Sequence, residues 1–138
     1  MSSFARQQKA LVTTMVLIAA AEGEMTDSEL GMIGRLVATL PVFRDFDRET
    51  IPEIGRHVAI VLQKERGVHE LVTEIQAALD RPLRETAYLL ACDVAAADGV
   101  AGQDELQVLE NLRDWLELDS LVAAAIERAA AARYRNHH

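Results

Sequence analysis

Aromatic residues and prolines are scarce in this chain of 138 residues. Half of the residues are hydrophobic but only 4% are aromatic, so the core must consist of Ala, Leu, Val and Ile. Ala and Leu are strong helix formers, whereas the aromatic residues that favour strands are few. Only three prolines interrupt the chain, and no stretch alternates polar and apolar residues with a period of two. We therefore expect an all-α fold.

Cysteine and the common catalytic motifs are also lacking. Cys92 is the single cysteine, which excludes an internal disulfide and any multi-cysteine zinc site. Its alanine-rich surroundings indicate a small core residue. A nucleophile elbow, a P-loop and the glycine pattern of dinucleotide-binding folds are absent from the sequence. These absences predict a protein that is not an enzyme, and the lone cysteine fits a cytoplasmic location.

Positive charge is in short supply. The chain has 14 Lys and Arg against 22 Asp and Glu, which gives a formal net charge of −8. Such a surface repels phosphate backbones and anionic membranes, so we expect no nucleic-acid partner. It attracts cations or the basic surface of another protein. We expect a protein partner. The sequence indicates neither the identity of this partner nor the oligomeric state.

The hydrophobic runs of the chain are short. Residues 10–21 and 86–97 form two apolar runs that are too short to span a bilayer, so we expect no direct membrane insertion. The first run follows Arg6 and Lys9 in the manner of a signal peptide. The second is a similar run in the middle of the chain, where no signal peptide occurs. We therefore interpret both runs as buried helices of a repeated unit.

An acidic turn occurs twice, as AEGEMTDSEL at residues 21–30 and ADGVAGQDEL at residues 97–106. The two copies are offset by 76 residues. The offset pairs Glu22 with Asp98, Gly23 with Gly99 and Glu29 with Glu105. The sequence thus predicts a duplicated helix–acidic turn–helix unit, over about residues 10–40 and 86–116. We expect one domain over residues 1–138.

Capping residues, prolines and apolar stripes predict about seven helices. Thr26 with Glu29, and Thr50 with Glu53, have the spacing of capping boxes that start the second and third helices. Gly67 is expected to end the third helix. Leucines at the helical spacing, including Leu30 and Leu106, are expected to face the core. The predicted helices cover about residues 3–22, 26–40, 50–67, 68–79, 80–97, 103–117 and 120–133.

The acids of the two turns have two explanations. Glu29 and Glu105 stand third in their predicted helices, where a carboxylate caps backbone amides and faces the positive helix end. Carboxylates also suit hard divalent cations. The turns do not match a calcium EF-hand loop, because the twelfth position counted from Asp98 is Leu109. A cation site would therefore have to be assembled between the two copies.

Asp93 lies inside the second apolar run, where the first copy has Leu17. A carboxylate on a buried face is costly unless it is paired or ligated. Asp93 and Asp98 both lie near the C-terminal end of a predicted helix, an end that disfavours negative charge. One interpretation is a compensating metal ion. The other is that Asp93 faces solvent, or pairs with an arginine such as Arg84 or Arg113.

The repeated pattern, AAAEGEMTDSEL and VAAADGVAGQDEL, resembles that of the TerB-like family of tellurite-resistance proteins. The second copy is similar to the family pattern D-x-x-x-A-D-G-x-x-x-x-x-E. The resemblance implies a compact helical domain that acts in bacterial stress response, often through partner proteins. Related domains are also fused to DnaJ-like co-chaperones.

Carried over by position, the resemblance implies divalent-metal ligands at Asp93, Asp98 and Glu105, joined by Glu22 and Glu29 from the first copy. The first copy departs from the pattern, because Glu22 replaces an aspartate and Leu17 replaces the upstream acid. Our leading hypothesis is a non-enzymatic domain that binds a divalent cation of unknown identity. The alternatives are a metal-free acidic protein-interaction module or co-chaperone adaptor and, third, an enzyme with an assembled carboxylate site.

Overall fold

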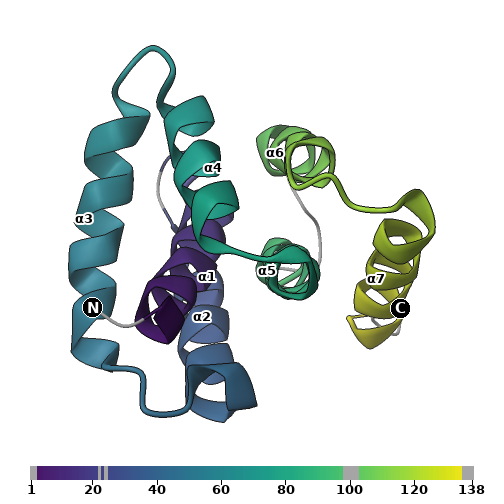
Figure 1. Cartoon of the computed structure of the whole chain (residues 1–138), viewed down its shortest axis with the longest axis horizontal. Coiled ribbons are helices and arrows are strands. Elements are labelled where there is room, and N and C mark those ends of the chain that lie inside the picture. The colour runs from purple at the N-terminus through teal and green to yellow at the C-terminus, as the bar shows by residue number, and fades with distance from the viewer. Residues whose placement is uncertain (1–2, 22, 24, 98–102, 135–138) are drawn as a thin grey trace.

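Helices make up nearly all of the regular structure in the computed structural model, which describes residues 3–21, 23, 25–97 and 103–134 (Figure 1). No strand occurs in these residues, so the predicted all-α fold is confirmed. The helices are α1 (Ser3–Ala19), α2 (Asp27–Thr39), α3 (Ile51–Leu62), α4 (Gly67–Ala78), α5 (Arg81–Ala95), α6 (Gln103–Trp115) and α7 (Ser120–Arg133), with short 3₁₀ turns at η1 (Pro41–Phe43) and η2 (Arg48–Thr50).

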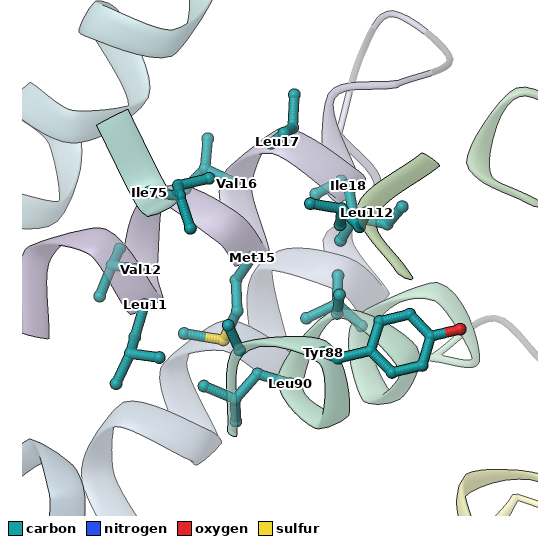
Figure 2. Packing of buried hydrophobic residues seen from close by; sticks show 14 of the residues in the cluster. Leu11, Val12, Met15, Val16, Leu17, Ile18, Ile75, Tyr88, Leu90 and Leu112 are labelled. Carbon is teal, nitrogen blue, oxygen red and sulfur yellow. The ribbon is translucent and has the colours of Figure 1, made fainter. Parts of the chain in front are cut away.

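Helix α1 lies at the centre of the fold and packs against α2, α3, α4, α5 and α6. Its residues 10–19 are all buried, as expected for a helix that is apolar on every side. Met15 of α1 lies beside Leu90 of α5, and Ile18 lies near Leu112 of α6 (Figure 2). Helix α1 therefore joins the N-terminal and C-terminal halves into one core.

Helices of the two acidic-turn units pack against each other. Helix α1 packs against α5, α2 also contacts α5, and α6 also contacts α1. Helices α2 and α6 each have 13 residues, and Ala19 and Ala95, which end α1 and α5, differ by the same 76 positions as the turns. The ends of α1 and α5, and both bounds of α2 and α6, thus correspond between the halves. The duplication of the unit itself stays a prediction.

Three of the predicted helix starts are confirmed in detail. The Thr26 hydroxyl accepts from the amide of Glu29 while the Glu29 carboxylate accepts from the amide of Thr26, which is a complete capping box. Asp80 caps α5 and Asp119 caps α7 through bonds to amides in the first turn. Gly23, which follows α1, has a φ of 106°, in the left-handed region that favours glycine after a helix end.

Two predictions around α3 were wrong. Thr50 makes no capping bond, because its hydroxyl donates to the Asp47 carbonyl within a 3₁₀ turn. Gly67 does not end α3, which stops at Leu62. It is the first residue of α4. A Cβ at Gly67 would collide with the carbonyl oxygen of Val61, so glycine is required here by a close approach of the backbone.

Leu30 and Leu106, which occupy corresponding positions, were predicted to face the core, and this was wrong. Their side chains are 46% and 52% exposed. Leu30 lines an open groove between α2 and α3, and Leu106 lines another between α6 and α7. The apolar stripes of α2 and α6 therefore extend past the core and onto the surface.

Candidate functional site

Asp93 is a buried carboxylate near the C-terminal end of α5. Its residue exposure is 1%, and its neighbours Cys92 and Val94 are buried as well. The corresponding residue of the first copy, Leu17, is fully buried. Asp93 therefore occupies a core position, and the interpretation that it faces solvent was wrong.

Arg133 is the partner of Asp93. Its Nη1 atom, at the end of α7, donates to Asp93 Oδ2 over 2.9 Å. The interpretation that Asp93 pairs with an arginine is thus confirmed, but the two arginines named as examples were wrong, because Arg113 pairs with Glu127 and Arg84 donates to backbone carbonyls. A contact between residues 40 positions apart depends on how α7 returns to α5, which no local pattern in the sequence reveals.

Arg133 and Tyr134 compensate the charge of Asp93 in part. Burial raises the pKa of this carboxyl above its ordinary value, and the neighbouring Arg133 and a hydrogen bond with Tyr134 lower it in part. Among the described residues, Asp93 Oδ1 is buried without a hydrogen-bond partner. The Arg133 side chain is 49% exposed, so it compensates a buried charge from the surface. The position therefore favours a further positive charge or donor near Oδ1.

Glu29 and Glu105 are also buried carboxylates, each third in its helix. Their exposures are 3% and 5%. Glu29 Oε1 accepts from both the amide and the hydroxyl of Thr26, over 2.9 and 3.1 Å. The capping interpretation is thus confirmed for Glu29. Capping does not explain why both carboxylates are buried, because a carboxylate can cap a helix equally well at the surface.

The remaining two predicted ligands, Glu22 and Asp98, lie outside the described residues. Within the described part, Asp93, Glu29 and Glu105 do not form a group of three or more metal-binding side chains. The donors themselves are carboxylate oxygens, which fit a hard cation such as Ca²⁺, Mg²⁺ or Mn²⁺. A group of three or more ligands would therefore have to include Glu22 or Asp98.

A second polar cluster joins α5, α6 and α7, and sequence reasoning missed it. The Tyr88 hydroxyl donates to Glu127 Oε2 over 2.5 Å, and Arg113 pairs with the same oxygen over 3.1 Å. The Tyr88 hydroxyl points out of the apolar cluster in which its ring is packed (Figure 2). Burial and the bond to Glu127 raise the pKa of Tyr88 above its ordinary range.

Cys92 lies beside this cluster and is buried. Burial raises the pKa of the Cys92 thiol to about 12, although a hydrogen bond with Tyr88 opposes the shift. A thiol of this kind is protonated at neutral pH and is a poor nucleophile. The prediction of a small core residue is confirmed, and the cluster has the character of a structural link between helices.

The family model of the tellurite resistance protein TerB matches residues 8–129. The chain belongs to the TerB family. TerB is a family of helical, non-catalytic domains, in agreement with the fold. Asp93, Glu29 and Glu105 fall within the matched residues, whereas Arg133 lies beyond them. No curated protein and no solved structure matches the chain. None of the described helices combines the length and the apolar character that crossing a membrane requires.

Proposed function

We propose that this TerB-family chain is a non-enzymatic, cytoplasmic domain of a tellurite-resistance-type stress response, and that it binds a divalent cation. The observation that carries the proposal is Asp93, a carboxylate with 1% exposure whose Oδ1 has no hydrogen-bond partner in the described part of the chain. A buried, half-satisfied carboxylate is costly in a protein that only needs a core. A bound cation removes that cost.

The placement of Asp93 supports the same proposal. It lies three residues before the C-terminal Ala96 cap of α5, where the partial negative charge of the helix end disfavours a carboxylate. The acidic turn that follows adds Asp98. Arg133 offsets one of these charges from a half-exposed position. A divalent cation between Asp93 and the turn compensates the rest.

The ligands we propose are Asp93, Asp98 and Glu105 of the second copy, with Glu22 and Glu29 of the first. Glu29 Oε1 already accepts two hydrogen bonds from Thr26, so Glu29 binds through its other oxygen if the cap is kept. A cation held by both copies joins the start of α2 to the start of α6. At a free cation concentration of a hundred times the Kd, binding raises the free energy of unfolding by about 2.7 kcal/mol.

Calorimetric titration of the full chain with Ca²⁺, Mg²⁺, Mn²⁺ and Zn²⁺ tests this function. We expect one of the hard cations to bind more tightly than millimolar, and Asp93→Asn or Asp98→Ala to weaken binding at least ten-fold. Glu53→Gln is the matched control, since Glu53 is an exposed acid on α3 and is not one of the proposed ligands. Absence of cation binding, or an equal loss of cation affinity in Glu53→Gln, rejects the cation site.

A metal-free acidic interaction module or co-chaperone adaptor is the second candidate function. The net charge of −8 favours it, together with the absence of a three-ligand group among the described side chains. This function predicts that a chelator leaves the melting temperature unchanged. It also predicts a basic protein partner that dissociates as salt screens the charges.

A further inference from the structure

Helices α2 and α3 both pack against α1 (Figure 1). A groove lies between α2 and α3. Its volume is about 430 Å³, within the range of small-molecule sites. Val16 of α1 contributes to the lining, and the two walls supply almost entirely apolar residues. None of these residues belongs to the proposed cation ligands. The lining consists of Val16, Met25, Leu30, Ile33, Gly34, Ile51, Pro52, Gly55, Arg56 and Ala59.

Glycines on both walls keep the groove open. Gly34 lies within α2 and Gly55 within α3, and a Cβ added to either would meet no atom of the described residues within 4 Å. Their place within helices gives no conformational reason for glycine, and replacement by Ala at such a site raises the folding equilibrium constant roughly two- to five-fold. Gly67 is different, because the Val61 backbone blocks a side chain there. Packing against the described residues therefore does not require glycine at Gly34 and Gly55, and both leave space in the groove for an occupant.

The lining selects the chemistry of that occupant. Arg56 is the one charged side chain among the described residues of the groove, and no ion pair of Arg56 occurs in the described part of the chain. A sugar or nucleotide would leave most of its polar groups unpaired against the apolar walls. A cationic amphiphile would be repelled by Arg56. Leu30, 46% exposed at the wall, offers apolar area that an occupant would cover.

We propose that the groove between α2 and α3 binds an amphipathic anion, with an unbranched apolar chain against Gly34 and Gly55 and a carboxylate paired with Arg56. The guanidinium matches a carboxylate in shape and charge. The chain needs no hydrogen bonds from the walls. Each methylene that the groove covers strengthens binding by up to about four-fold. The groove contains none of the proposed cation ligands, so a failure of dodecanoate binding and a failure of cation binding are distinguishable.

Titration of the full chain with sodium dodecanoate below its micellar concentration tests the proposal, followed by calorimetry and by amide chemical shifts. We expect saturable binding, with shift changes centred on Leu30, Gly34 and Gly55. Octanoate is expected to bind at least ten-fold more weakly, because it has four fewer methylenes. Dodecyltrimethylammonium, which has the same chain and the opposite charge, is expected to bind at least ten-fold more weakly than dodecanoate.

Two pairs of variants locate the site. Gly34→Leu fills the groove with a side chain of the protein, and is expected to weaken dodecanoate binding at least ten-fold without lowering the melting temperature. Gly31→Leu is the matched control on the same helix, because Gly31 does not line the groove and its added Cβ makes only an ordinary contact with Arg35. Arg56→Glu is expected to reverse the preference for the anionic head, and Arg35→Glu to leave it unchanged.

Three results overturn the proposal. The first is the absence of saturable dodecanoate binding to the unaltered chain. The second is binding that Gly34→Leu and Gly31→Leu affect equally, which places the anion elsewhere. The third is equal affinity for the two head groups, which removes the role of Arg56. The wild-type shift map keeps the test valid if Gly34→Leu fails to fold.

Discussion

The ion pair between Asp93 and Arg133 gives the most quantitative prediction of the structure. Arg133→Met keeps an apolar stem at the end of α7 and removes the guanidinium that donates to Asp93 Oδ2 over 2.9 Å. Asp93, which is 1% exposed in the wild-type chain, then loses its ion-pair partner. We expect the variant to fold, with a lower free energy of unfolding.

The size of the loss follows from the burial of the two side chains. Removing one partner of a fully buried pair costs about 3–5 kcal/mol. Arg133 is 49% exposed, so water can reach the position of its guanidinium and hydrate Asp93 in part. A hydrogen bond to a charged group is worth about 1.5–3 kcal/mol. We therefore expect a loss of about 2 kcal/mol, which lowers the melting temperature by about 6–8 °C in a chain of this size.

Urea unfolding of four proteins in EDTA measures this loss: the wild type, Arg133→Met, Asp93→Asn and the double variant. When Asp93→Asn is already present, the arginine has no carboxylate to compensate, so adding Arg133→Met is expected to cost under about 1 kcal/mol. A cost below about 0.5 kcal/mol in the wild-type background would refute the reasoning. An equal cost in both backgrounds would also refute it, since the loss would then come from packing of the stem.

The same pair predicts a pH dependence. The pKa of Asp93 is raised in the folded chain, so the native state holds a proton that the unfolded state has released, and stability falls as the pH rises through the folded pKa. Without Arg133 that pKa rises further. The deficit of Arg133→Met is therefore expected to be smallest in acid and to grow towards neutral pH. A deficit that grows on acidification contradicts the assignment.

Three smaller predictions concern other contacts. Thr26→Ala removes one half of the capping box of α2 and is expected to lower the free energy of chemical unfolding by about 1 kcal/mol. An unchanged free energy of unfolding would mean that Glu29 caps α2 alone. Tyr88→Phe removes the hydroxyl that donates to Glu127 and is expected to cost about 1 kcal/mol, whereas a stabilised variant would show that the buried hydroxyl is poorly satisfied. The Cys92 thiol, with a pKa of about 12, is expected to react with Ellman's reagent at about pH 8 only on unfolding, and rapid reaction in the native chain would contradict its burial.

Local patterns in the sequence predicted most of the fold. The helix start at Thr26 was predicted because a cap and the amides it binds lie within three residues of each other. Thr50 shows the limit of this reasoning, because its hydroxyl bonds backward to Asp47 instead of forward into α3. Spacing identifies the residues that can cap, and the turn before the helix decides which of them do.

Contacts between distant segments were beyond the reach of the sequence. Asp93 was identified as an unusual acid because it interrupts an apolar run, yet its partner Arg133 lies 40 residues away at the end of an alanine-rich helix. Leu30 and Leu106 have the spacing of core residues but lie at open grooves. An apolar stripe shows which face of a helix is hydrophobic, and only the packing shows how much of that face is covered.

Paramagnetic broadening by Mn²⁺ tests the cation site at its proposed place. Substoichiometric Mn²⁺ is added to the isotope-labelled full chain, and amide signals are followed before and after a chelator. Binding at the acidic residues predicts that the signals of Asp93 and Glu105 broaden first and recover with the chelator, and that Asp93→Asn abolishes the effect. Uniform broadening, or broadening centred on exposed acids such as Glu53, would contradict the account.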